Sequence, residues 1–364
     1  MILDSLAQFS NLYGSNPDLV LCGGGNTSAK DGGIMYIKAS GTALGTIRPD
    51  EFVAMDRAKL TAMMDKTYPE ADAPREAAAL ADLMDARMPN QGSKRPSVET
   101  LLHNLFPTRF VLHLHPSLVN GMTCSKDGEK VCGTLFPEAV WVGECKPGYI
   151  LAKTCHILLG AFKAAHGKDA HLVFLKNHGV FFAADDTDAL DAMLQSVLQT
   201  LRARCDVLPD LTETAAADPA LGNQLASLYG ENAAWQFCGC ADAVRFAESE
   251  DAMRPLMEPF SPDHIVYCKA FPLYLSDPAQ AQAAFAAYVA QYGYAPQVIY
   301  VRGQGFYVVA NSETRAQAAR LLAVDAIKIA RYAENFGGAE PQRPALTDFI
   351  INWEVEAYRA KLAK

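Results

Sequence analysis

Two histidines separated by one residue, His113 and His115, are the first residues whose type and spacing suggest chemistry. They end an apolar run over residues 110–115, which predicts a strand closed by Pro116. Side chains two apart on a strand point to the same face, so both imidazoles can bind one metal ion such as Zn²⁺. A hydrogen-bonded pair at the strand end is the alternative interpretation.

His178 is the candidate for a third ligand. It directly follows a predicted strand at 171–176, and strand ends in mixed sheets are where sites gather. The next residue, Gly179, would permit a turn and a close approach of the backbone. Taken alone, this histidine is more typical of a structural residue than of a ligand.

Glu99 and His103 are four residues apart, on one face of a helix predicted to start at Pro96-Ser97 and to run through Phe106. Ser97 is the expected N-cap of this helix. A carboxylate beside a metal could bind the metal or take a proton, whereas a helix-surface residue is the default interpretation. His103 is expected to support packing rather than to bind metal.

Small and polar residues at 24–28 (GGNTS) and 40–42 (SGT) predict turns. Exposed backbone N–H groups and hydroxyls there could form an anion cradle, with charge from Lys38 or Lys30. Neither segment matches a P-loop or a dinucleotide-binding fingerprint. Ordinary turns are the alternative.

Length and composition limit the function classes. The 364 residues predict about two domains, and a chain that is 50% hydrophobic and 20% charged is typical of a globular protein. A net charge of −9 argues against a nucleic-acid partner and against an anionic-membrane partner, but leaves room for a local basic pocket. Nine cysteines without a CxxC pair predict reduced thiols in a cytoplasmic protein, and no signal peptide or membrane-spanning run is expected.

The expected elements divide the chain near a polar, proline-containing segment at 206–222. The predicted domains are 1–210 and 211–364. In the first, we expect helices over 1–15, 51–85 and 187–205 and strands over 34–38 and 139–142. In the second, we expect helices near 222–229, 240–253, 278–291, 313–334 and 350–364 and strands near 264–274 and 297–310. Glu354 and Glu356 are expected on a solvated helix face.

Two segments resemble each other. Residues 172–190 align with 298–316 without a gap, so that Gln304 takes the place of His178. Each segment reads as a strand, a turn with glycine, a second strand and a helix. The second domain is therefore either a degenerate copy that lost its histidine or an unrelated unit of the same kind.

The motifs in their order (GGGNTSAK, IKASGT, PSVETLLH, HLHP, KNHG) resemble the class II aldolase/adducin family over residues 10–205. The chain looks closest to the aldolase portion of bifunctional rhamnulose-1-phosphate aldolase/alcohol dehydrogenases, where SPDHIVYCKAFPLYL and VRGQGFYVV also have similar counterparts. Those proteins continue into a Rossmann dehydrogenase domain beyond the part that residue 364 reaches, so we expect no oxidoreductase activity from these 364 residues.

This resemblance implies an α/β fold, an αβα sandwich with a central, mainly antiparallel sheet flanked by helices, plus a smaller C-terminal α+β domain. It implies a homo-oligomer such as a tetramer, and a divalent metal, zinc or else Mn²⁺ or Co²⁺. Its site residues fall on these positions: the metal ligands on His113, His115 and His178, the catalytic acid/base on Glu99, and substrate or phosphate contacts on Asn26, Thr27, Ser40, Gly41 and Ser97.

The function implied is cleavage of a ketose 1-phosphate of the rhamnulose or fuculose type, through a metal-stabilised enediolate, to dihydroxyacetone phosphate and an aldehyde. A sugar-acid decarboxylase or a pentulose-phosphate 4-epimerase on the same metal site is the alternative. A non-catalytic scaffold like adducin is a third interpretation. The chain has a single serine, Ser97, where the family's aldolases often have two before the acidic residue. Tyr149 is a weak candidate for the proton-donating tyrosine that some members use.

Overall fold

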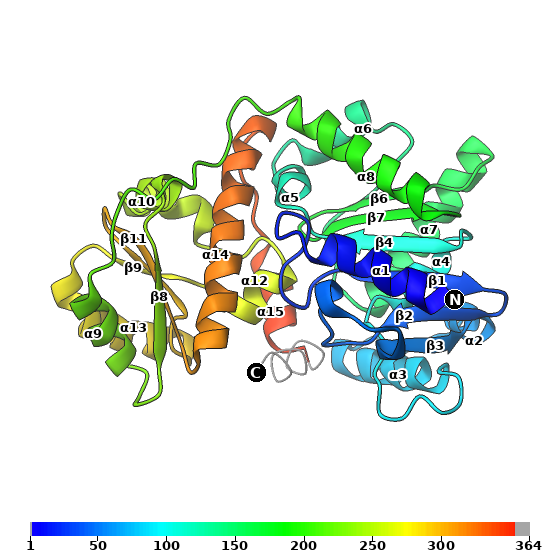
Figure 1. Ribbon diagram of the computed structural model, residues 1–364, viewed down its shortest axis with the longest axis horizontal. Coiled ribbons are helices and arrows are strands. Elements are labelled where there is room, and N and C mark those ends of the chain that lie inside the picture. Colours follow the sequence, from blue (N-terminus) through cyan, green and yellow to red (C-terminus); the bar gives the residue numbers. More distant parts are fainter. Residues whose placement is uncertain (1, 354–364) are drawn as a thin grey trace. The chain divides into compact units, whose positions relative to one another are not determined.

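A seven-stranded sheet organises the first of two compact units (Figure 1). The computed structural model describes residues 2–353. The first unit runs to Thr123 and includes Gly128–Arg204, and the second contains Cys124–Asp127 and the chain from Cys205 onward. Each unit is described by itself.

The strand order in the first sheet is β3-β2-β1-β4-β7-β6-β5. The strands are β1 (Asn26–Asp31), β2 (Ile34–Lys38), β3 (Phe52–Asp56), β4 (Phe110–Leu114), β5 (Val140–Val142), β6 (Leu172–Leu175) and β7 (Gly179–Ala184). All neighbours pair antiparallel except β5 and β6. The expected fold, a mainly antiparallel sheet flanked by helices, is therefore confirmed.

Helices cover both faces of this sheet (Figure 1). They are α1 (Ile2–Gly14), α2 (Arg57–Ala62), α3 (Asp72–Asp85), α4 (Thr100–Leu105), α5 (Ser117–Thr123), α6 (Gly128–Leu135), α7 (Tyr149–His166) and α8 (Thr187–Arg202). Residues of α2, α3, α4 and α7 form a core with one face of the sheet, whereas α1 contacts β1, and α5 and α8 contact β7. The histidine-bearing strand β4 thus lies in a layer that is protected from water.

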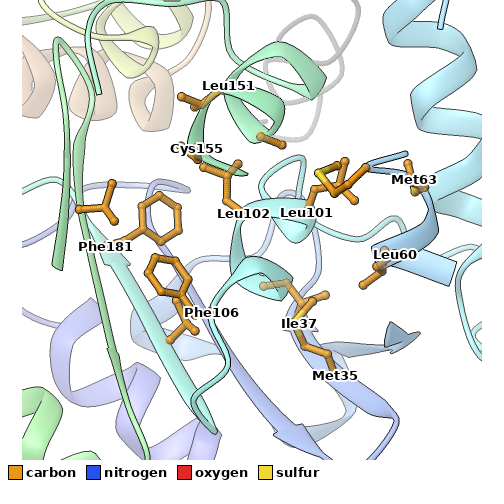
Figure 2. Close-up of a cluster of buried hydrophobic side chains, with 14 of the residues drawn as sticks. Met35, Ile37, Leu60, Met63, Leu101, Leu102, Phe106, Leu151, Cys155 and Phe181 are labelled. Carbon is orange, nitrogen blue, oxygen red and sulfur yellow. The ribbon is translucent and has the colours of Figure 1, made fainter. Parts of the chain in front are cut away.

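Between the sheet and helices α4 and α7, the core consists of buried apolar side chains (Figure 2). Met35, Ile37, Val111 and Phe181 point into it from alternate positions of their strands, as a period of two requires. Each is fully buried, which stabilises the fold by roughly 1.5–3 kcal/mol per side chain. Phe181 also stacks on His113 with ring centroids 4.1 Å apart, so this core supports the imidazole directly.

Several elements differ from those expected from the sequence. The sequence predicts a turn at residues 26–28, yet they begin the interior strand β1, whose polar side chains find partners inside the unit. Residues 52–56 form β3 rather than a helix, because they pair along the whole of β2. The helix expected from Ser97 starts at Thr100, with Glu99 as its N-cap residue, and the backbone N–H of Ser97 is bonded to the Lys38 carbonyl (3.1 Å).

The second unit is built on a four-stranded sheet in the order β8-β11-β10-β9. Its strands are β8 (Ala234–Cys238), β9 (Leu273–Leu275), β10 (Val298–Val301) and β11 (Gly305–Ala310). Its helices are α9 (Pro219–Ser227), α10 (Ala241–Phe246), α11 (Glu250–Met253), α12 (Pro262–Cys268), α13 (Ala281–Tyr292), α14 (Glu313–Ala333) and α15 (Pro344–Ile351). The smaller second sheet agrees with the expected α+β extension.

Two expectations for the second unit were wrong. Residues 262–268 are helical and only 273–275 form a strand, because Pro262 occupies the first helical position, where its fixed φ and missing N–H favour a helix start. The strand β8 was missed. The expected terminal helix at 350–364 lies largely outside the described residues, with Glu354 and Glu356.

The two sheets share a strand order and a register. In the first, β4-β7-β6-β5 pair so that His113 is opposite Phe181 and Leu175 is opposite Gly179. In the second, β8-β11-β10-β9 pair so that Phe237 is opposite Tyr307 and Val301 is opposite Gly305. Both sheets end in one parallel pair, β5 with β6 and β9 with β10. The alignment of 172–190 with 298–316 therefore matches equivalent positions in two similar sheets.

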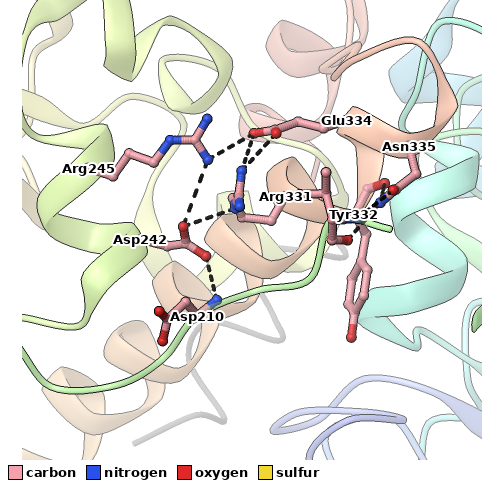
Figure 3. A network of polar contacts seen from close by, with 8 residues as sticks. Asp210, Asp242, Arg245, Arg331, Tyr332, Glu334 and Asn335 are labelled. Atoms are coloured by element: carbon pink, nitrogen blue, oxygen red, sulfur yellow. Dashed lines mark hydrogen bonds and ion pairs between the residues drawn. The ribbon is translucent and has the colours of Figure 1, made fainter. Parts of the chain in front are cut away.

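A network of charges fastens the end of α14 in the second unit (Figure 3). Arg331 Nε lies 2.9 Å from Asp242 Oδ1, and Arg331 Nη1 lies 2.7 Å from each carboxylate oxygen of Glu334. Asp242 also accepts a hydrogen bond from the backbone N–H of Asp210 (2.6 Å). Burial raises the pKa of Asp242, and Arg331 opposes that rise.

Among residues 2–353, no helix is both long enough and apolar enough to cross a membrane.

We predict that Arg331→Met lowers the free energy of unfolding of the second unit by about 3 kcal/mol, because it removes the nearer cation of the buried Asp242 carboxylate and leaves only the half-exposed Arg245, 3.9 Å away. Arg254→Met is the matched control, since the pair of Arg254 with Asp251 is exposed (81% and 87%) and should change the free energy by less than about 0.5 kcal/mol. Urea unfolding of both variants measures the difference. Equal effects of the two substitutions would contradict the account.

Candidate metal centre

Three imidazoles meet where β4 ends and the turn between β6 and β7 begins. His113 is in β4, His115 follows the end of that strand, and His178 lies in the turn just before β7. Because β7 pairs with both β4 and β6, the end of β4 lies next to the turn between β6 and β7. One ring nitrogen from each histidine lies within 4.8 Å of the others. The structure thus brings together the three histidines that the sequence analysis grouped.

The backbone fixes which nitrogen of His113 faces the cluster. Nδ1 of His113 lies 3.0 Å from the Val180 carbonyl, and since a carbonyl can only accept, Nδ1 carries the proton. Nε2 then has a bare lone pair, 2.9 Å from His115 Nε2. Burial lowers the pKa of His113 to about 4, so the imidazole is neutral at neutral pH, the form that binds a metal.

Glu99 joins the cluster from the start of α4, where it is the N-cap residue. Its Oε1 lies 3.1 Å from Nε2 of both His113 and His178, and Asn26 Nδ2 donates a hydrogen bond to Oε2. The carboxylate is 6% exposed. Burial disfavours its ionised form, but positive charge on the side of His113 and His178 outweighs burial and holds the pKa of Glu99 well below its usual value.

The donor set fits a divalent cation. The lone pair of His113 Nε2 lies 3.1 Å from the carboxylate oxygen Oε1 of Glu99, and these two acceptors repel one another unless a positive charge lies between them. Glu99 Oε1 is buried and receives no well-aligned hydrogen bond. Three neutral imidazoles and one carboxylate are ligands that Zn²⁺ accepts. His113, His115 and His178 can therefore hold such an ion, with Glu99 beside it.

The turn that carries His178 depends on two residues. Asn177 has φ +56, a left-handed conformation that asparagine tolerates better than most residues. A Cβ at Gly179 would lie 2.4 Å from the Leu114 carbonyl oxygen and 2.7 Å from His115 Cδ2. The expected close approach is therefore at Gly179, whereas the left-handed turn falls on Asn177.

The loops expected to bind an anion are held together by one lysine. Lys38 is buried, and its Nζ donates to the carbonyls of Gly23 (3.1 Å) and Thr42 (2.6 Å). Ser40 in this loop is half-buried and Gly41 is exposed, with φ +85. These two residues are available to a ligand, and the role of Lys38 in the structure is to fasten the loops.

Ser97 and Asn26 act on Glu99. Ser97 is buried, and its Oγ accepts a hydrogen bond from the backbone N–H of Glu99 (3.2 Å). Asn26 is opposite His113 in the pairing of β1 with β4, which places its amide beside the carboxylate. Asn26 Oδ1 is buried without a hydrogen-bond partner and faces the same region. Both residues orient the carboxylate.

The structure does not bring the remaining candidates into the cluster. Thr27 is fully buried with its hydroxyl 2.6 Å from Ser10 Oγ, and Lys30 donates to the Thr108 carbonyl (3.0 Å). His103 Nδ1 bonds Ser28 Oγ (2.8 Å), so this histidine packs beneath the site, as expected. The Tyr149 hydroxyl is bonded to backbone carbonyls of Met63 (3.5 Å) and Lys66 (3.2 Å).

Sequence reasoning missed two supports of the site. The Val180 carbonyl fixes His113, and Asn120 Nδ2 donates to the His178 carbonyl (3.2 Å). A backbone carbonyl leaves no signal in side-chain types, and Asn120 lies in a short helix with no spacing relation to His178. Both become visible only when the strands pair.

Comparisons with known proteins agree on the first unit. The family model described as "Class II Aldolase and Adducin N-terminal domain" matches residues 5–203, more than half of the chain. A curated relative from Bacillus subtilis (strain 168), named "Uncharacterized oxidoreductase YuxG", is 26% identical over 208 residues, which are 54% of this chain and 28% of that protein. The match thus spans little more than a quarter of that relative's length.

Solved structures of similar proteins include the N-terminal class II aldolase domain of a conserved protein from Thermoplasma acidophilum, which is 26% identical with a TM-score of 0.46. The match covers 56% of this chain and 93% of that one. An L-fuculose 1-phosphate aldolase is 16% identical with a TM-score of 0.37, covering 62% and 88% of the two chains.

We predict that Gly179→Ala weakens the affinity for Co²⁺ or Zn²⁺ by about 10–100-fold, because the added Cβ would push His115 and the Leu114 carbonyl away from their positions. Gly160→Ala in α7 is the matched control, since a Cβ there meets nothing within 4 Å. Competition with a chromophoric chelator measures the affinity, and circular dichroism checks folding. A folded Gly179→Ala variant with unchanged affinity would contradict this account.

Proposed function

Because this chain belongs to the class II aldolase and adducin family, we propose that its first unit is a divalent-metal-dependent aldolase acting on a ketose 1-phosphate. The products would be dihydroxyacetone phosphate and an aldehyde such as lactaldehyde. One observation carries this proposal: at the end of β4, three imidazole nitrogens lie within 4.8 Å of one another, and the buried Glu99 carboxylate lies 3.1 Å from two of them. A scaffold protein has no need of such a costly cluster.

The metal would be held by His113, His115 and His178, with zinc as the first choice for three imidazoles. When bound, a divalent cation acts as a Lewis acid that stabilises negative charge on the ketone and hydroxyl oxygens of a substrate. The Val180 carbonyl keeps His113 in the tautomer that binding requires.

Glu99 would move the proton at the reacting carbon. In the direction of synthesis, its carboxylate removes a proton from the carbon beside the ketone. That carbon then bonds to the aldehyde carbon, whose oxygen takes up a proton, and cleavage is the reverse. Asn26 and Ser97 hold the carboxylate and its backbone in place, which keeps the base aimed at one position.

The phosphate of the substrate would be bound near Ser40 and Gly41. Lys38 fastens their loop to the glycine-rich loop, so backbone N–H groups there are held in a fixed arrangement. Ser97 contributes through Glu99 rather than as a phosphate contact. A sugar phosphate is thus the proposed small-molecule partner, and a cytoplasmic homo-oligomer the proposed form.

We also propose that the second unit is a degenerate copy of half of the first sheet. The strand order and the register are the same. The helices that follow the two hairpins, α8 and α14, also begin in the same way. The side chain of Asp186 accepts a hydrogen bond from the backbone N–H of Ala189, and the side chain of Ser312 accepts one from the backbone N–H of Arg315. At the positions of His113 and His178 this unit has Phe237 and Gln304. It would therefore hold no metal at that place.

We predict that Glu99→Gln lowers the turnover of rhamnulose 1-phosphate or fuculose 1-phosphate by about 10²–10⁴-fold, because glutamine cannot accept the proton. The exposed Glu138→Gln is the control and should leave turnover unchanged. Enzyme-coupled detection of dihydroxyacetone phosphate measures cleavage, and metal analysis shows that both variants still bind the ion.

Unaltered cleavage by Glu99→Gln would overturn the assignment of the base. If the metal-loaded protein cleaves no ketose phosphate but releases CO₂ from oxo-sugar acids, or epimerises pentulose phosphates, the aldolase assignment is wrong.

A further inference from the structure

Two cysteines of the second unit, Cys238 and Cys240, lie in contact with each other. Cys238 is the last residue of β8, Cys240 directly precedes α10, and Gly239 separates them. Their Sγ atoms are 3.6 Å apart, and both thiols are free. Both residues are buried, with 2% and 1% of their surface exposed. The pair lies outside the candidate metal centre, and no step of the proposed reaction uses it.

The fold does not require sulfur at these two positions. Equal register of the two sheets makes β8 the counterpart of β4. Cys238 then takes the place of Leu114, and Cys240 takes the place of Pro116. A leucine and a proline fill these positions in the first unit, so the two thiols bring to the second unit a chemical property that packing alone does not explain.

An exposed ion pair lies beside the two thiols. Glu213 is opposite Cys240 in an isolated antiparallel bridge, which puts the two side chains on the same face. Arg320 of α14 lies with Nη2 3.6 Å from Glu213 Oε1, and the two side chains are 31% and 60% exposed. Arg320 Nε also donates to the carbonyl of Phe237, the residue before Cys238 (2.8 Å). A cation and an anion at the protein surface thus accompany the buried sulfurs.

The surroundings favour one negative charge on this pair. Hydrogen bonding with Cys240 lowers the pKa of Cys238 against the effect of burial, and the charge of Arg320 adds to the lowering, whereas Glu213 opposes it. Hydrogen bonding with Cys238 and burial raise the pKa of Cys240. Burial likewise raises the pKa of Cys132, to about 12. Because the thiolate is the nucleophilic form of cysteine, Cys238 is the sulfur that attacks first.

We propose that Cys238 and Cys240 form a modification site for hydroperoxides, at which a reversible disulfide closes and the route from solvent passes the pair of Glu213 and Arg320. In the first step, the Cys238 thiolate attacks a peroxide oxygen and the O–O bond breaks. The departing oxygen leaves as water with the proton that the thiol had lost, and Cys238 becomes a sulfenic acid. In the second step, the Cys240 sulfur attacks the Cys238 sulfur, the S–O bond breaks, and the hydroxyl leaves as water with the Cys240 proton. Two thiols and one hydrogen peroxide become one disulfide and two waters, so the sulfurs lose two electrons and the peroxide gains them.

Closing the bond brings the two sulfurs from 3.6 Å to about 2.0 Å. The small ring that forms has glycine at its centre, the residue whose backbone adapts most readily. The Gly239 carbonyl accepts from the backbone N–H groups of Thr214 (2.8 Å) and Ala215 (2.9 Å), so closing also pulls on this neighbouring segment. A bond that encloses so short a loop adds little stability to the fold, and a dithiol should therefore reopen it.

Peptide mapping of the full-length protein after a short exposure to hydrogen peroxide tests the proposal. The peptide that contains residues 238–240 should lose two hydrogen atoms about tenfold faster than Cys132 is oxidised, and dithiothreitol should restore both thiols. Three results would overturn the proposal: a 238–240 peptide that stays reduced while other cysteines react, one that only gains oxygen, or a disulfide from either cysteine to a third one.

Substitutions in the ion pair separate an effect of charge from a simple effect of access. Glu213→Gln removes an anion and should speed disulfide formation by about 2–10-fold, whereas Arg320→Gln removes a cation and should slow it by a similar factor. Glu138→Gln in the first unit is the control and should leave the rate unchanged. Since both substitutions break the same ion pair, acceleration by both would contradict attack by a charge-stabilised thiolate.

Cysteine variants identify which sulfur attacks. Cys240→Ser leaves Cys238 without its partner, so the reaction should stop at a sulfenic acid that dimedone labels at Cys238. Cys132→Ser is the matched control and should still close the disulfide between Cys238 and Cys240. Circular dichroism checks that both variants are folded. A folded Cys240→Ser protein with no dimedone label at Cys238 would contradict the proposed first step.

Discussion

A carboxylate kept out of water beside three imidazoles is the constraint on which the first unit depends. Glu99 is nearly fully buried, and its Oε1 lies 3.1 Å from Nε2 of both His113 and His178. Such a group is costly unless its charge is matched. Strand β4, the turn at Asn177 and the Val180 carbonyl place the imidazoles around this carboxylate, and a cation would match its charge.

The strands that could be predicted from the sequence are those whose pattern of apolar residues reflects their burial. The runs 110–114 and 172–175 are largely apolar on both faces, and the histidine spacing after the first of them indicated a candidate metal site. The interior strand β1 was not predictable, because NTSAKD is mostly polar and is stabilised by partners far along the chain, such as Ser10 and His103. Strand β3 was hidden for a similar reason, since pairing with β2 decides its conformation.

The residues that meet at the site were predictable, whereas the residues that support them were less so. Histidine and glutamate types limit the chemistry, so His113, His115, His178 and Glu99 could be named from spacing and resemblance. Thr27 could not be separated from Asn26, because which of two adjacent strand residues faces the carboxylate depends on register. The tautomer of His113 rests on a backbone carbonyl, about which the sequence is silent.

The central claim is tested most directly by the metal content of the purified protein. We expect about one divalent ion per chain, retained in the control His156→Ala/His166→Ala, whose histidines are exposed on α7, and lost in His113→Ala/His115→Ala. A protein that binds no divalent ion even after reconstitution, or a His113→Ala/His115→Ala variant that keeps its ion, would contradict the metal centre and the function built on it.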